Sequence, residues 1–379
     1  MKRKTLLCAF CAFWALPFVA YAQQERVTDE SPLVQQISVI KEKQDKFNFY
    51  MHTHMSADQK WGTEGVKPFT FNARELRMEA RGNVTERFSY RLMYRLNVMQ
   101  DATRAVDGQP GSLDVAGIGI KFNKQWSAFL GRQCAAYGGI QFDYNPVQVY
   151  EYVSILNTLP IFLTGVKVAY EPVSGQQFQL QVLNSQNDNL KNLYQNDPSK
   201  PQFKEALVPL DYTFNWNGKI ANCFDTRWSY SYITETDRHA TQYIALGNLF
   251  HCGRWEGYFD AMFARVGLNA GRVIPAQENG EYHSYVLKAK YSLSDRWKVF
   301  AKGMYETAGA GSSSRWGDQK KELTTLSYVG GVEYYPMPKS DLHFFLVYTG
   351  KHFDYTNPVQ KDFNTNRLSL GFIWQIPVF

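Results

Sequence analysis

The chain has 379 residues, a formal net charge of +6 and a mean hydropathy of −0.39. Beyond its first residues it has no run of the roughly 18 apolar residues that a membrane-spanning helix needs. The charge is too small to argue for nucleic acid as a partner. Aromatic residues nevertheless make up 16% of the chain, and such a share in a chain of low hydropathy is typical of transmembrane β-barrels, whose aromatic girdles lie at the membrane interfaces.

The first 22 residues are predicted to be a signal peptide. A positive region, Lys2–Lys4, precedes the apolar stretch Leu6–Val19, and Ala20–Ala22 forms an A-x-A-like cleavage site. Cleavage there removes three basic residues and lowers the formal charge to +3. The chain is therefore expected to be exported, and an exported chain meets no nucleic acid.

Residues 23–45 are predicted to be a periplasmic leader. Leu33, Val34, Ile37 and Ile40 have helical spacing, so the segment could form a short helix. A stretch of this length is marginal as an isolated helix, and a poorly ordered terminus is the competing interpretation.

From residue 46 to residue 379, apolar and polar residues alternate in blocks of about ten, the length of a tilted strand that crosses a bilayer. In one such block Phe88, Leu92 and Tyr94 share a face that suits lipid, and Arg91 and Arg95 share the opposite face. About sixteen such strands are predicted, at residues 46–55, 68–81, 86–98, 113–123, 125–133, 162–170, 176–184, 205–216, 222–233, 241–251, 253–265, 282–293, 296–307, 324–335, 341–353 and 367–379.

Short and long connections alternate between these blocks. Tight turns are expected at dipeptides such as Gly82-Asn83, Ser174-Gly175 and Asn217-Gly218, with longer loops between them. Outer-membrane barrels have short periplasmic turns, longer external loops and an even number of strands. The pattern predicts an all-β fold, a single transmembrane antiparallel up-and-down β-barrel over residues 46–379.

The end of the chain agrees with export to the outer membrane of a Gram-negative bacterium. Leu368, Leu370 and Phe372 alternate with polar or small residues, and the chain stops at Phe379. This resembles the terminal strand that barrel-assembly machinery reads, although Pro377 removes a backbone donor near its end.

Several segments resemble the phosphate-selective porin O and P family. They are the hairpin around Arg74–Gly82, the strand end Leu130–Gln133, and Gly165–Val168 with Leu180–Asn184. The resemblance implies a sixteen-stranded porin, usually a homotrimer, that passes anions through a lumen lined by basic residues. Cys134–Gly138 replaces a Pro-Phe-Gly-like element of the family, and no residue here is matched to the family's phosphate-binding residues.

The pore lining is predicted from the face opposite the apolar stripe of each strand. Rings of Arg and Lys are typical of anion pores, so the basic residues on this face predict an anion preference. The alternative is that the arginines pair with Glu75 and Glu79 and give no selectivity. The principal pore-lining basic residues are Arg77, Arg87, Arg91, Arg95, Lys121, Lys167, Arg227, Lys288, Lys290 and Lys302, with Arg81, Lys298 and Lys351 also inward. Opposing acids, about half as many, are Glu79, Asp225, Glu256, Asp260, Glu306 and Glu333.

The loop 134–161 is the longest candidate for a constriction that folds into the lumen. Its aromatics, among them Tyr137, Tyr144 and Tyr150, could stack against sugars as a solute slides past. The commoner role of such residues is to pack a loop onto the barrel wall.

Cys223 and Cys252 are predicted to oppose each other across one hairpin at the periplasmic rim. A disulfide is one interpretation, since the periplasm is oxidising. Two unpaired thiols, offset by one or two residues, are the other.

The sequence as a whole predicts a porin for passive diffusion of small anionic or neutral solutes, in contact with lipid and lipopolysaccharide. No cofactor, metal or enzymatic activity is expected; His52 and His54 share a strand face, but no third ligand is indicated. The alternatives are a structural or surface-interaction barrel with a plugged lumen and, from another class, an outer-membrane hydrolase.

Overall fold

The computed structural model describes residues 46–98, 106–188, 190, 203–269, 273–274, 278–311, 319–338 and 340–378. The predicted signal peptide (1–22) and leader (23–45) lie outside the described residues. No helix among the described residues is long and apolar enough to span a membrane.

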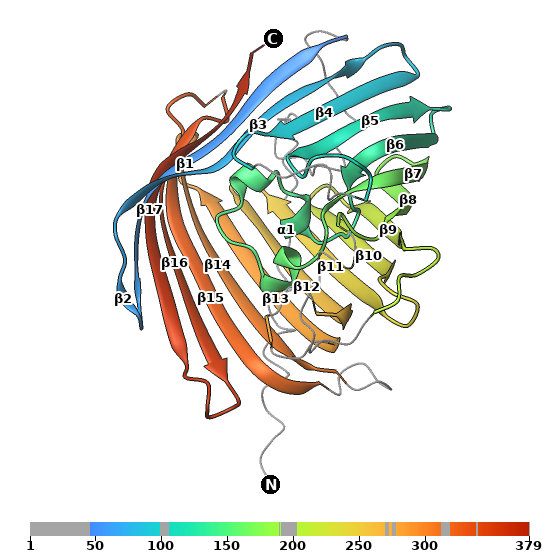
Figure 1. Ribbon diagram of the computed structural model, residues 1–379. Helices are drawn as coiled ribbons and strands as arrows, with labels where there is room; N and C mark the ends of the chain where they lie inside the picture. The colour runs from blue at the N-terminus through green and yellow to red at the C-terminus, as the bar shows by residue number, and fades with distance from the viewer. Residues whose placement is uncertain are drawn as a thin grey trace. The chain divides into compact units, whose positions relative to one another are not determined.

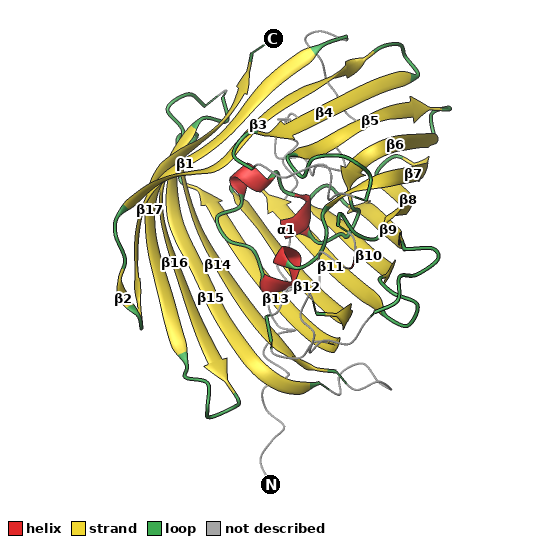
Figure 2. Cartoon of the chain, viewed as in Figure 1, coloured by secondary structure: helices red, strands yellow, loops and turns green. Residues whose placement is uncertain are grey.

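Within the described chain, sixteen long antiparallel strands form one closed sheet, as the sequence predicts (Figures 1 and 2). A two-residue strand, β2 (Gly65–Val66), extends the connection after the first of them. The long strands are β1 (Asn48–Gly62), β3 (Thr70–Asn83), β4 (Phe88–Arg95), β5 (Leu113–Lys121), β6 (Trp126–Cys134), β7 (Phe162–Val173), β8 (Gln176–Asn184), β9 (Leu210–Ile220), β10 (Phe224–Thr234), β11 (Ala240–Cys252), β12 (Trp255–Leu268), β13 (Glu278–Ser292), β14 (Trp297–Ala310), β15 (Lys320–Tyr334), β16 (His343–Tyr355) and β17 (Phe363–Pro377).

The first and last strands close the barrel. β1 pairs with β17 from Tyr50↔Pro377 to Gly62↔Thr365, and each remaining strand pairs with its sequence neighbours. Closure satisfies the backbone hydrogen bonds that an open edge would leave unpaired in lipid.

The period of two sorts side chains between lipid and lumen. On β4, Phe88, Leu92 and Tyr94 are exposed on the outside, whereas Arg91 and Met93 are buried inside. The same alternation on the other strands gives an apolar outer face and an inner face rich in charged and polar groups.

Two predicted turns are wrong. Gly82 and Asn83 remain inside β3, whose ladder with β4 runs to Asn83↔Ser89. Asn217 and Gly218 remain inside β9, and the hairpin turns three residues later, where Ala221 has a positive φ of 60°. The ladder between β9 and β10 extends to Ile220↔Phe224, so its added strand pairs outweigh the local preference of Asn-Gly for a turn.

Candidate pore constriction

Most of the predicted basic residues lie on the inner face of the barrel. Arg77, Arg91, Lys167, Arg227, Lys290 and Lys302 are buried inside it, and Arg95 and Lys288 are partly buried there. Two placements differ from the prediction. Arg87 lies in the exposed turn before β4, because that strand begins at Phe88, and Lys121 is exposed at the end of β5.

The arginines of β3 and β4 are paired with acids. Arg91 Nε lies 2.8 Å from Glu79 Oε1, and Arg95 Nη2 lies 2.9 Å from Asp114 Oδ1. Arg77 contacts both Asp114 and Glu75, at 3.2 and 3.0 Å. The structure therefore contains the arginine–acid pairing that the sequence left open as an alternative. The wall formed by β3–β5 is close to neutral as a result.

The lumen also holds acids that the sequence analysis missed. Asp58, Asp114 and Asp211 are all buried on the inner face. Arg74 and Arg367 are inner-face basic residues that were likewise not predicted, and each contacts an acid inside the barrel. A selective field must come from the local arrangement of charges and not from their total number.

The connection between β6 and β7 folds into the barrel. It contains the short helix α1 (Ile140–Asp143) and two 3-10 turns, Pro146–Gln148 and Ser154–Asn157, drawn in red within the ring of strands in Figure 2. The chain enters past Gly139, whose φ of 83° suits glycine. A Cβ on Gly247 of β11 would lie 2.7 Å from Gly139 Cα, so the wall needs glycine there as well.

Acidic side chains of the strands hold this loop. Asp260 of β12 accepts hydrogen bonds from the backbone N–H groups of Ile140 and Gln141, both at 2.8 Å. Glu306 of β14 accepts the N–H of Ser154 at 2.6 Å, and Glu333 of β15 accepts the Tyr150 hydroxyl at 3.0 Å.

The other side of the barrel anchors the beginning of the loop. Gln181 of β8 accepts the N–H of Ala136 at 2.6 Å, and Asn215 of β9 donates to the Ala136 carbonyl at 3.2 Å. Arg227 of β10 lies 3.1 Å from Asp143. Together with the contacts to β12, β14 and β15, these anchors stretch the loop across the lumen.

The aromatic residues of the loop pack onto the wall, the role that the sequence analysis set against sugar stacking. Tyr150 stacks on Phe300, with ring centroids 5.2 Å apart and planes 6° apart, and meets Phe345 edge-on. Tyr144 lies against Tyr258 at 5.6 Å. These rings fill part of the lumen and leave less room for water.

Glu151 joins the loop to the strands through its side chain and its backbone. Lys351 Nζ lies 2.6 Å from Glu151 Oε1, and Arg367 Nη2 lies 3.0 Å from Glu151 Oε2. Lys302 Nζ donates to the Glu151 carbonyl oxygen at 2.5 Å. Burial acts to raise the pKa of Glu151, but Lys351 and Arg367 outweigh it and hold that pKa below its usual value. The carboxylate is therefore ionised at neutral pH.

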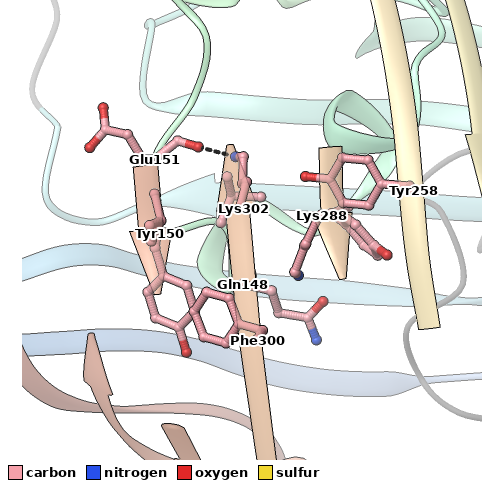
Figure 3. A pocket seen from close by; sticks show the side chains of 10 residues that line it. Gln148, Tyr150, Glu151, Tyr258, Lys288, Phe300 and Lys302 are labelled. Carbon is pink, nitrogen blue, oxygen red and sulfur yellow. Dashed lines mark hydrogen bonds between the residues drawn. The ribbon is translucent and has the colours of Figure 1, made fainter. Parts of the chain in front are cut away.

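A small cavity, about 10 Å³, separates this part of the loop from β12–β15. Its charged lining residues are Lys288, Lys302 and Glu151, and Figure 3 shows the Glu151 carboxylate turned away from the cavity. Lys288 Nζ lies 5.1–5.8 Å from the ring centroids of Tyr144, Tyr258 and Phe300. The cavity thus presents two lysines and no carboxylate, and it has room for about one water molecule.

Lys288 and Lys302 are direct cross-strand partners on β13 and β14. Like charges in this position destabilise a sheet unless something compensates them. Aromatic rings surround Lys288, and Lys302 donates to the Glu151 carbonyl. The Glu256 carboxylate lies behind the cavity, where it accepts the Tyr144 hydroxyl at 3.1 Å. Two lysine side chains therefore lie together on one side of the constriction.

The predicted disulfide is not formed, because Cys223 and Cys252 are free thiols. Phe224 pairs with Phe250, and the Cys223 carbonyl accepts the His251 N–H at 2.9 Å. Cys223 therefore lies opposite His251. An offset of one residue turns the Cys252 side chain to the other face of the sheet.

The two histidines of β1 have structural partners. His52 Nε2 lies 2.8 Å from Glu79 Oε2, and the His54 ring packs edge-on against Phe345 at 5.3 Å. Among the described residues, no group of three His, Cys, Asp or Glu side chains is arranged to hold a metal ion.

Similar barrels occur among solved structures. The outer membrane channel DcaP of Acinetobacter baumannii superposes with a TM-score of 0.62 at 12% identity, over 89% of this chain and 99% of that one. An anion-selective porin from Comamonas acidovorans superposes with a TM-score of 0.59 at 9% identity, over 88% of this chain and 100% of that one. The trimer form of OmpT, an outer membrane protein of Vibrio cholerae, superposes with a TM-score of 0.53 at 12% identity, over 87% of this chain and 100% of that one.

At these identities the solved structures establish the fold alone. No curated protein sequence matches the chain. The family model named phosphate-selective porin O and P matches residues 47–376, almost the whole barrel. The chain therefore belongs to the phosphate-selective porin O and P family of outer-membrane porins.

Proposed function

We propose that the protein is a diffusion porin with a preference for small anions. The observation that carries the proposal is the cavity at the constriction, where Lys288 and Lys302 face the lumen and the Glu151 carboxylate is turned away (Figure 3). A basic constriction inside a low-dielectric wall attracts anions and repels cations. Phosphate-type anions are the candidate solutes that the family name suggests.

Recording the current through the purified protein in a planar bilayer under a KCl gradient tests this proposal. An open lumen gives stepwise conductance, and an anion preference moves the reversal potential toward the chloride equilibrium potential. Lys288→Gln/Lys302→Gln should move it back toward zero. A reversal potential on the cation side for the unmodified protein would refute the anion preference.

A plugged barrel is the second candidate, and the anchoring of the loop favours it. The segment from Ala135 to Ile161 contacts β8–β10, β12 and β14–β17, and the cavity beside it is smaller than a solute. A plugged barrel would give no current at any voltage, so the same recording separates the two functions.

We infer the remaining assignments from the family and the fold. The short turns are placed in the periplasm and the long loops outside, in contact with lipopolysaccharide. A homotrimer is proposed because this porin family usually forms trimers and the Vibrio cholerae barrel has a trimer form. Residues 1–22 are proposed to be a signal peptide. No enzymatic activity is proposed.

A further inference from the structure

The contacts of Glu151 differ from those of the other acids at the constriction. Asp260, Glu306 and Glu333 belong to strands, are at most 5% exposed and accept hydrogen bonds from the loop. Glu151 belongs to the loop, and its side chain reaches out to Lys351 and Arg367 of the wall.

The two wall residues form a geometry suited to a carboxylate. Lys351 of β16 contacts one carboxylate oxygen, and Arg367 of β17 contacts the other. An arginine presents a planar set of N–H donors, and a lysine adds a compact charge. Any carboxylate of the right reach could make the same two contacts.

Water in the lumen can reach the contacts that Lys351 and Arg367 make with Glu151. The side chains of Lys351, Arg367 and Glu151 are 19%, 20% and 15% exposed, whereas the charged pair between Arg77 and Asp114 is at most 2% exposed. A solute can therefore approach the cations without unfolding the wall.

The Glu151 side chain can leave without taking the loop with it. The backbone on either side is held separately, by the Lys302 contact to the Glu151 carbonyl, by the Arg367 contact to the Tyr150 carbonyl at 2.9 Å, and by the stacking of Tyr150 on Phe300. Figure 3 shows the Lys302 contact on one side of Glu151 and its carboxylate on the other.

We propose that Lys351 and Arg367 form a binding site for a carboxylate solute, and that Glu151 occupies this site as a tethered competitor which the solute displaces. The inference rests on the proposed porin function, since it names a class of solute. A tethered group competes at an effective concentration in the millimolar range or above. The site therefore rejects dilute anions and accepts a carboxylate that arrives in quantity.

The test compares the unmodified protein with Glu151→Gln, which has nearly the same shape and no charge. Acetate is the probe, and the chloride current in a planar bilayer is measured as acetate is added. Glu151→Gln should lower the acetate concentration that reduces the current by half, by about tenfold or more, because the competitor is gone. Equal concentrations in the two proteins would overturn the inference.

Asp225→Asn is the matched control, because it removes one inner-face acid on β10 that does not hold the loop and leaves Lys351 and Arg367 untouched. Its response to acetate should equal that of the unmodified protein, and a shift as large as that of Glu151→Gln would overturn the inference. If Glu151→Gln does not fold, Glu151→Asp takes its place. Its shorter side chain reaches the cations less well, so an intermediate shift is expected and no shift contradicts the proposal.

Binding of ¹³C-labelled acetate to the detergent-solubilised proteins, followed by NMR line broadening, separates this inference from the porin function. Tighter binding to Glu151→Gln in a barrel that carries no current would refute the porin function and support the site. A conducting barrel in which Glu151→Gln binds acetate no more tightly would support the porin function and refute the site. A gain for inorganic phosphate alone would refute the carboxylate class.

Discussion

Two walls of this barrel use the same kinds of charged residue in different ways. On β3–β5, the acids contact the arginines of neighbouring strands, as Glu79 does with Arg91 and Asp114 with Arg95. On β12–β15, acids such as Asp260 and Glu306 accept hydrogen bonds from the inward loop. The first wall is a charge-paired network, and the second is an anchor for the constriction.

The difference shows that a count of inward charges does not describe how those charges are paired. β3 and β4 carry five arginines. Arg74 contacts Asp58, and the other four contact Glu75, Glu79 or Asp114, so their charges largely cancel at contact distance. Lys288 and Lys302 instead line a cavity whose one acidic lining residue, Glu151, turns its carboxylate away. Under the proposed function, a solute would meet the second arrangement at the narrow part of the lumen.

Breaking the charge-paired wall should have the largest effect. Arg91→Gln leaves Glu79 buried without its closest arginine, and loss of one partner of a buried pair costs about 3–5 kcal/mol. The urea midpoint of barrel unfolding should therefore fall. Arg91→Gln/Glu79→Gln removes both charges and should recover most of the loss. If Arg91→Gln is as stable as the unmodified barrel, Arg91 does not compensate the buried charge of Glu79.

Releasing the loop should have the next largest effect. Asp260→Ala leaves the N–H groups of Ile140 and Gln141 without their acceptor, at about 1–3 kcal/mol for each. The loosened loop should raise the single-channel conductance and the current noise. Asp354→Ala, an exposed change on β16, is the control and should do neither. An unchanged conductance in Asp260→Ala would show that the loop does not limit the current.

The smallest expected effect is a pH dependence confined to strong acid. Lys351 and Arg367 hold the pKa of Glu151 below the ordinary value of 4.5 against the opposing effect of burial. Because the pKa of Glu151 is depressed, its contact with Lys351 and Arg367 is complete at pH values above 4.5. The contact is lost only as the pH falls through the depressed pKa. The reversal potentials of the unmodified protein and Glu151→Gln should therefore differ equally at pH 7 and pH 5. A difference that vanishes between these values would contradict this assignment.

The strands of both walls could be predicted because lipid and water impose a period of two on every one of them. Residues that depend on register were harder to predict. The one-residue offset between Cys223 and Cys252 and the acid partner Asp114 follow from pairings that turn preferences do not determine.

The loop was recognisable from its length and its aromatics, but its contacts were not. Glu151 meets Arg367 across 216 positions of the chain, and no local pattern connects two residues so far apart. Its partners became evident only once the barrel had closed and the loop lay inside it.

The most direct test of the account is the reversal potential in a KCl gradient for three proteins: the unmodified barrel, Lys288→Gln/Lys302→Gln and Arg91→Gln/Glu79→Gln. We expect the anion preference to fall in the lysine variant and to persist in the paired-wall variant, which removes one charge of each sign. An anion preference that survives in the lysine variant and disappears in the paired-wall variant would contradict the claim that the constriction lysines set the selectivity.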